Sequence, residues 1–275
     1  MAGSWRIGVC SWSLEPPDAA ALAARASATG VTAVQLALDP IRLGIMGVGE
    51  IRSRLEEAGL SIASGMMAMD GEDYSTLASI RETGGVAPDT TWPANREAAR
   101  ELATIAAELG IGLVSFHAGF LPESPRDPRW GVMLDRLREL AELFGERDVR
   151  IALESGQEAA PVLLRMLDAL AAQQVGVNFD PGNLVLYGSG DPVAALHLLA
   201  PHIVQVHIKD ALPALDAGFW GSEVPVGDGA MDWAAILGGL RQCPALSTLV
   251  IEREAGTTRG DDIREARRFL ESILG

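Results

Sequence analysis

Short apolar runs alternate with longer amphipathic stretches along the whole chain. Eight runs have the composition of buried strands: 6–11, 33–37, 60–65, 111–117, 149–154, 175–180, 203–207 and 248–252. In the stretches between them, apolar residues recur every three to four positions, as in a helix with one buried face. The clearest of these stretches are 19–30, 95–110, 130–145, 161–172 and 261–274.

Strands that alternate with helices predict a parallel sheet, because the crossover between parallel neighbours is a helix. Eight such units in 275 residues match an α/β fold of the (β/α)8 TIM-barrel type, and we predict one domain over residues 1–275. A doubly wound sheet is the alternative. No GxGxxG sequence follows any of the eight runs, so the usual dinucleotide-binding turn is missing.

Alternation within the strands separates a bulky face from a smaller, more polar one. In 175–180, Val177 and Phe179 share one face, whereas Asn178 and Asp180 share the other. The same alternation runs through the neighbouring strands. The bulky face suits the layer beneath the helices, and the polar face suits the crowded barrel interior.

Four of these strands end in a residue type that binds metals, namely Glu154, Asp180, His207 and Glu252. All four fall on the interior face, at the carboxyl ends of strands, where such barrels keep their active sites. Three carboxylates and one imidazole suit a single divalent ion. Mn²⁺ is our first choice, with Mg²⁺, Co²⁺, Zn²⁺ or Fe²⁺ as alternatives. We therefore predict a metal site at the barrel mouth.

A divalent ion at this place would polarise a substrate carbonyl and stabilise the enediolate that forms when the adjacent C–H proton leaves. Glu154 and Glu252 lie on non-adjacent strands, so we expect them to be the catalytic pair that exchanges protons on opposite faces of one carbon. As an alternative, Glu154 is a structural hydrogen-bonding group.

The other three ligand candidates also have structural alternatives. Asp180 suits a turn or the cap of the next helix. Glu252 could form a surface ion pair with Arg253 or Arg259. His207 could be a hydrogen-bonded core histidine. Because these alternatives treat each residue singly, the shared phase of the four favours the metal site.

Substrate-binding candidates surround the predicted mouth. His117 ends the fourth strand, Lys209 follows His207, and Glu158 and Trp12 lie just after other strand ends. Each of these four residues also has a structural alternative. His117 could be a packed, hydrogen-bonded histidine and Lys209 a surface lysine. Glu158 could begin a helix, and Trp12 could belong to the core. Two long segments, 66–95 and 210–230, follow strands on the same side, and we expect the second to be an irregular binding loop.

Charge and cysteine content narrow the class of protein. A net charge of −15 argues against non-specific nucleic-acid binding. The only cysteines, Cys10 and Cys243, cannot form a disulfide framework. The N-terminal residues lack the pattern of a signal peptide, and no apolar stretch reaches the roughly 18 residues of a membrane span. We therefore predict a cytoplasmic protein with no membrane partner.

The four strand ends, together with HIKD (207–210) and VGDGAMDW (226–233), resemble the xylose isomerase-like TIM-barrel superfamily, within its sugar phosphate isomerase/epimerase group. This resemblance extends over nearly the whole chain, from GVCSWSL (8–14) to the last helix. It implies a metal-dependent sugar or polyol isomerase or epimerase of carbohydrate metabolism, with an inosose-type dehydratase as the alternative. It also implies a homodimer or homotetramer.

Two positions depart from the ketose 3-epimerases of that group. Asn183 stands where they have a substrate-binding histidine, and we keep Asn183 as a substrate-binding candidate. Pro213 stands where an arginine is expected. The related endonuclease IV-like branch needs a multi-zinc cluster rich in histidine, which four histidines and the acidic charge argue against. A non-catalytic sugar-binding barrel is the third possibility.

Overall fold

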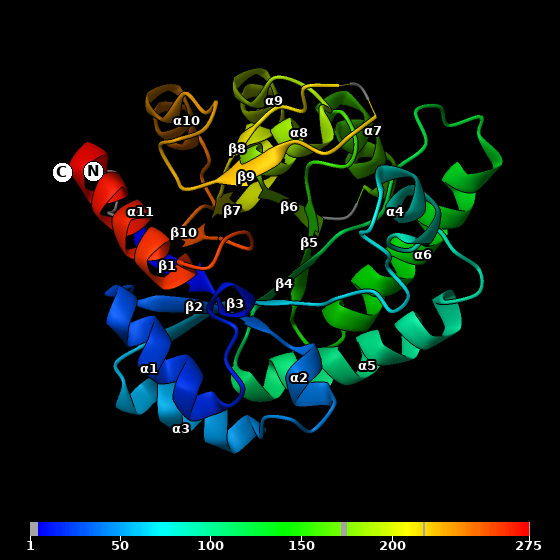
Figure 1. Cartoon of the computed structure of the whole chain (residues 1–275). Helices are drawn as coiled ribbons and strands as arrows, with labels where there is room; N and C mark the ends of the chain where they lie inside the picture. Colours follow the sequence, from blue (N-terminus) through cyan, green and yellow to red (C-terminus); the bar gives the residue numbers. More distant parts are fainter. Residues whose placement is uncertain (1–4, 172–174, 217, 275) are drawn as a thin grey trace.

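Eight parallel strands close into a barrel in the order β1-β10-β7-β6-β5-β4-β3-β2 (Figure 1). The computed structural model describes residues 5–171, 175–216 and 218–274, so position 172 of an expected helix and position 217 of an expected loop lie outside this part. The barrel strands are β1 (Arg6–Cys10), β2 (Ala33–Ala37), β3 (Ser61–Met66), β4 (Leu113–Phe116), β5 (Arg150–Glu154), β6 (Val175–Phe179), β7 (Ile203–Ile208) and β10 (Thr248–Ile251). The predicted single (β/α)8 domain is confirmed.

Helices surround the barrel on its outside (Figure 1). They are α1 (Ala19–Thr29), α2 (Asp39–Arg42), α3 (Val48–Glu57), α4 (Leu77–Thr83), α5 (Trp92–Leu109), α6 (Pro128–Gly145), α7 (Ala160–Leu170), α8 (Pro181–Tyr187), α9 (Pro192–Leu199), α10 (Trp233–Leu240) and α11 (Arg259–Leu274), with 3-10 turns η1 (Ser11–Leu14) and η2 (Ala200–His202). Among the described helices, none is both long and apolar enough to span a membrane.

The two strand faces divide as their alternation predicts. The outward side chains of Phe116, Leu153 and Phe179 are fully buried beneath the helices. The interior holds buried polar residues, and the parallel register sets Glu154 beside Asn178. The barrel centre is therefore a hydrogen-bonded polar layer enclosed by an apolar one.

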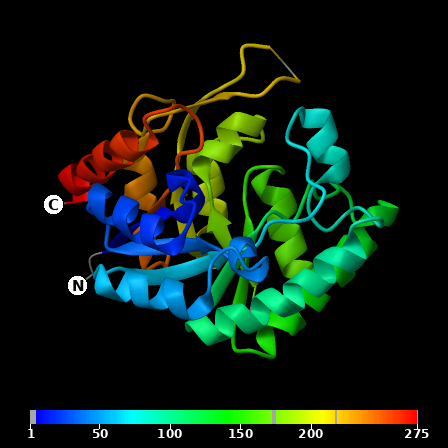
Figure 2. The same ribbon diagram turned by 60° about the horizontal axis from the view of Figure 1, so that its bottom comes forward.

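The segment 210–230 is not the irregular loop that the sequence suggests. It contains an antiparallel hairpin of β8 (Asp210–Leu212) and β9 (Ser222–Val224), whose connection projects at the top of Figure 2. The carboxylate of Asp210 holds the segment in place, because it accepts hydrogen bonds from the backbone N–H of Gly227 (2.9 Å) and from Trp233 Nε1 (2.8 Å). Segment 66–95 likewise contains α4 and the start of α5.

Candidate metal centre and substrate cavity

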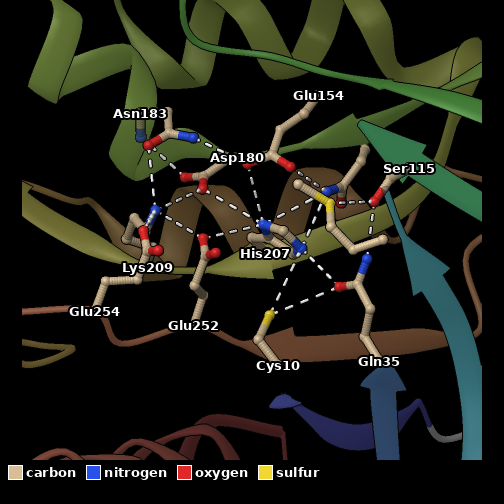
Figure 3. A network of polar contacts seen from close by, with 12 residues as sticks. Cys10, Gln35, Ser115, Glu154, Asp180, Asn183, His207, Lys209, Glu252 and Glu254 are labelled. Carbon is tan, nitrogen blue, oxygen red and sulfur yellow. Dashed lines mark hydrogen bonds and ion pairs between the residues drawn. The ribbon is translucent and has the colours of Figure 1, made fainter. Parts of the chain in front are cut away.

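Glu154, Asp180, His207 and Glu252 converge at the carboxyl end of the barrel. Each offers one ligand atom, and these four atoms all lie within 4.8 Å of one another. All four side chains are buried, and they point toward a common centre in Figure 3. Ligands on opposite sides of an ion with bonds of about 2.1 Å lie about 4.2 Å apart, so this spacing suits a single ion.

His207 presents one ring nitrogen to the carboxylates and the other to a glutamine. Its Nδ1 lies 3.1 Å from Glu252 Oε2 and 3.3 Å from Glu154 Oε1. Its Nε2 lies 2.8 Å from Gln35 Oε1. Since a carbonyl oxygen can only accept, Nε2 carries a proton. Burial opposes a charged ring, but the carboxylates of Glu252 and Glu154 raise the pKa of His207 well above its usual value, so that without a cation Nδ1 holds a proton too. A divalent ion would displace the Nδ1 proton, and Gln35 would then hold the ring in the tautomer that a metal ligand requires.

Asp180 uses its two carboxylate oxygens for two different purposes. Oδ1 accepts a hydrogen bond from the Asn183 backbone N–H at 2.9 Å and so caps α8. Oδ2 lies 3.6 Å from His207 Nδ1 and 3.5 Å from Lys209 Nζ. Asp180 therefore caps α8, as the structural alternative expects, and also contributes a carboxylate oxygen to the cluster.

Lys209, the only lysine of the chain, lies against this cluster (Figure 3). Its Nζ lies 2.7 Å from Glu252 Oε2 and 3.2 Å from Glu254 Oε2, and its side chain is 3% exposed. Gly182 permits this position, because a Cβ there would stand 2.7 Å from Lys209 Cγ. The surface-lysine alternative is wrong, since the ammonium is buried among carboxylates.

Burial opposes the ionised form of the carboxylates, and neighbouring charges decide the outcome. Burial alone would raise the pKa of Glu252, but Lys209 and His207 lower it well below its usual value. The pKa of Glu154 is also lowered, because His117 and His207 outweigh its burial. For Asp180, burial dominates and raises the pKa.

The donor set fits a divalent cation. Asp180 Oδ2 and Glu252 Oε2 are buried and accept no hydrogen bond from the described residues, although His207 and Lys209 lie beside them. Such oxygens retain lone pairs for a hard ion. Cys10 lies 3.7 Å from His207 Nε2, but burial raises the pKa of its thiol far above the usual value. A neutral thiol is a poor ligand, so the oxygen-rich set is the better candidate.

Besides Lys209, the structure brings three more of the predicted substrate-binding residues to the carboxylates. Trp12 Nε1 donates to Glu252 Oε1 at 2.7 Å. Asn183 Nδ2 donates to Glu154 Oε1 at 3.0 Å, and His117 Nε2 lies 3.4 Å from the same oxygen.

Glu158, in contrast, is buried and does not line the cavity above the cluster. Its Oε1 has no hydrogen-bond partner among the described residues, and burial raises its pKa to about 8.

The ion pairs considered for Glu252 are absent from the described part of the chain. Arg253 pairs with Glu223 (2.8 Å) and Asp262 (2.9 Å) instead.

A cavity of about 640 Å³ opens above the cluster. Trp12, His117, Asn183, Lys209 and Glu252 all contribute to its wall. The volume lies within the range of about 300–1,000 Å³ that is usual for small-molecule sites. The arrangement can therefore hold an ion at its floor and an organic molecule above it.

Several residues of the site escaped the sequence reasoning. Glu254 lies two residues after Glu252, and Asn178 lies two residues before Asp180. Strand alternation therefore places both on the same face as a candidate ligand. Glu72 and Tyr74 reach the cavity wall from the segment after β3, where the Tyr74 hydroxyl donates to Glu72 Oε2 at 3.2 Å. Gln35 lies in the middle of β2, and its contact with His207 depends on barrel closure.

A closed parallel barrel with a buried acidic and imidazole cluster at its mouth defines the class of protein. The family described as xylose isomerase-like TIM barrel matches residues 23–273, and the chain belongs to it. The rhizopine catabolism protein MocC of Rhizobium meliloti is 28% identical over 163 residues, which cover 54% of this chain and 50% of MocC. The chain thus matches about half the length of the curated relatives.

Solved structures agree with this assignment. A xylose isomerase domain protein from Planctomyces limnophilus is 26% identical with a TM-score of 0.89, over 98% of each chain. An L-ribulose 3-epimerase (18% identity, TM-score 0.76, 98% of this chain and 95% of that one) shares the fold. The probable 3-DHS dehydratase AsbF of Bacillus anthracis also shares the fold, with 16% identity and a TM-score of 0.75 over 97% of this chain and 98% of that one.

Proposed function

We propose that this protein is a divalent-metal-dependent isomerase or epimerase that acts on a sugar or polyol by proton transfer. The observation that carries the proposal is the buried cluster of Glu154, Asp180, His207 and Glu252 beneath an open cavity. Mn²⁺ is the ion we expect these residues to hold. When bound, it supplies a Lewis acid that makes the proton next to a substrate carbonyl more acidic.

The chain's own residues provide the proton transfer. Glu154 ends β5 and Glu252 directly follows β10. Because β6 and β7 separate these two strands in the barrel, the two carboxylates approach a substrate from different sides. Their lowered pKa values keep both groups ionised and able to accept a proton at neutral pH. Trp12 fixes Glu252, and Asn183 fixes Glu154, through the hydrogen bonds described above.

A dehydratase is the second candidate function. It would begin with the same proton abstraction and then expel a hydroxyl from the neighbouring carbon, which needs a proton donor. His117 and Lys209 line the cavity and can supply that donor. The fold shared with a probable dehydratase supports keeping this candidate.

The test is solvent deuterium exchange with a panel of ketoses, inososes and their phosphates, in Mn²⁺ and heavy water. Mass spectrometry separates the two reactions, because an epimerase leaves the substrate mass unchanged apart from deuterium, whereas a dehydratase releases water. Glu154→Gln and Glu252→Gln should each lower the exchange rate by about 100-fold or more. Glu56→Gln, which changes an exposed carboxylate outside the cavity, is the matched control.

Metal content measured on the same proteins completes the test. We expect about one ion per chain in the wild type and loss of the ion in the glutamate variants. Wild-type protein that takes up no metal from Mn²⁺ would contradict the proposal. Sugar binding without any exchange would instead favour a non-catalytic sugar-binding barrel.

A further inference from the structure

The charges around the cavity are poorly suited to a phosphate. Among the described residues that line it, Lys209 is the single lysine or arginine, against Asp39, Glu72, Glu252 and Glu254. The Lys209 ammonium is already surrounded by carboxylates, at 2.7 Å from Glu252 and 3.2 Å from Glu254. A phosphate is normally bound by uncommitted arginine or lysine side chains or by backbone N–H groups. The described wall offers no uncommitted cation.

Barrels of this kind usually bind a phosphate at the loops after the seventh and eighth strands. In this protein the arginines near those loops are already engaged in ion pairs. Arg253 follows β10, but it is bound to Glu223 and Asp262. Arg259 is paired with Glu15 at 3.1 Å. Neither arginine lines the cavity.

Aromatic side chains stand at the cavity wall instead. Tyr187 of α8 and Trp220 of the β8–β9 connection both line it, with ring centroids 4.9 Å apart and an interplanar angle of 62°. Phe120 supports Tyr187 from behind at 5.7 Å, and Gln157 Nε2 donates to the Tyr187 hydroxyl at 3.3 Å. The pair therefore offers a supported apolar surface.

Gly221 attaches this aromatic surface to the barrel. Its backbone N–H donates to Leu186 O at 3.0 Å, which joins the β8–β9 connection to α8 directly beside Trp220. A Cβ at Gly221 would stand 2.5 Å from Leu212 O, so the close approach requires glycine. Trp220 is thus held over Tyr187, whereas the adjacent Phe219 is 69% exposed and lies outside the cavity wall.

We infer that the substrate is an unphosphorylated sugar or polyol that keeps a carbonyl group and carries a bulky uncharged substituent, such as a glycoside with a ketone on its ring, and that Tyr187 and Trp220 bind this substituent. The inference rests on the proposed sugar chemistry of the metal centre and specifies its substrate class. A cavity of about 640 Å³ leaves room for such a group, since it lies in the range of drug-sized ligands. Apolar faces of the substituent would bury surface against the aromatic rings.

Calorimetric titration of the Mn²⁺-loaded protein with matched probes tests this inference. We expect phenyl β-D-glucopyranoside to bind about tenfold more tightly than methyl β-D-glucopyranoside, the gain that one good aromatic contact gives. Trp220→Ala should bring this ratio close to one by weakening the binding of the phenyl glucoside. Phe219→Ala, which removes an adjacent exposed ring, should leave the ratio intact.

D-fructose and D-fructose 6-phosphate form the second matched pair, and the phosphate should bind no more tightly than the free sugar. Tighter binding of the phosphate overturns the inference. So does a phenyl glucoside that binds no better than the methyl glucoside, or a Phe219→Ala effect equal to that of Trp220→Ala. Calorimetry measures binding and does not depend on proton exchange, so a failed exchange experiment would reject the proposed function and leave the binding result valid. Proton exchange that is faster with phosphorylated sugars would reject the inferred substrate class and leave the proposed function intact.

Discussion

Lys209 Nζ and Glu252 Oε2 lie 2.7 Å apart, and their side chains are only 3% and 4% exposed. The ammonium therefore offsets negative charge where three carboxylates converge. Breaking a buried ion pair by removing one partner costs about 3–5 kcal/mol, because the remaining charge is left uncompensated. The energetic importance of the pair should thus depend on whether another cation is present.

Lys209→Met should lower the free energy of unfolding by about 3–5 kcal/mol when metal is chelated. Mn²⁺ should stabilise this variant more than it stabilises the wild type, because the ion then supplies the missing positive charge. Urea denaturation with EDTA and with Mn²⁺ measures both effects. Arg138→Met, which removes a half-exposed cation paired with Asp135 at 3.4 Å, should cost less than about 1 kcal/mol in either condition. Equal Mn²⁺ effects in Lys209→Met and wild type would refute the argument.

The two roles of Asp180 can be separated by one substitution. Asp180→Asn keeps an oxygen that caps α8 but removes the charge that faces His207. We expect the wild type to gain about 2.7 kcal/mol at a Mn²⁺ concentration 100 times the dissociation constant, and the variant to lose most of this gain. Asp191→Asn is the control, because Asp191 caps α9 (2.7 Å to the Ala194 N–H) away from the site. A full Mn²⁺ gain in Asp180→Asn would remove Asp180 from the ligand set.

The convergence of the four candidate ligands could be predicted from the sequence because parallel strands of a barrel all end at one rim. Alternation alone decides that Glu154 and Asp180 face inward, and the closed order of strands then brings them together. The pairing of Gln35 with His207 spans 172 positions and crosses the barrel from β2 to β7. No local pattern specifies such a contact, so it becomes visible only in three dimensions.

The hairpin of β8 and β9 is hidden in the sequence for a different reason. Its strands have only three residues each, too few for alternation to show. Its position depends on the Asp210 carboxylate and on the close approach at Gly221, and neither contact follows from sequence periodicity. The aromatic wall that Trp220 forms with Tyr187 was missed for the same reason.

Gln35→Leu should weaken metal binding without removing a ligand. Gln35 Oε1 accepts from His207 Nε2 at 2.8 Å and so directs Nδ1 toward the carboxylates, where a metal ion would replace its proton. Loss of such a supporting hydrogen bond typically lowers metal affinity by about 10–100-fold. Competition with a fluorescent chelator measures the Mn²⁺ dissociation constant. Ser64→Ala changes another buried polar residue, whose Oγ has no partner among the described residues, and should leave the constant unchanged. Identical constants for Gln35→Leu and wild type would contradict the prediction.

Glu158 should give the protein a pH-dependent loss of stability. Its pKa is raised by burial from 4.5 to about 8, so between these values the folded state keeps a proton that the unfolded state has released. The free energy of unfolding contributed by this group therefore falls as pH rises from about 4.5 and levels off above about 8. The total is on the order of 5 kcal/mol.

Glu158→Gln carries no titrating group at this position, so its stability relative to the wild type should rise from pH 5 to about pH 8 and stay constant above that. Urea denaturation across this range gives the difference curve, in which the other titrating groups cancel. Glu56→Gln removes an exposed carboxylate and should give a flat difference. A flat curve for Glu158→Gln as well would show that the buried carboxyl is ionised in the folded protein, with a partner that compensates its charge.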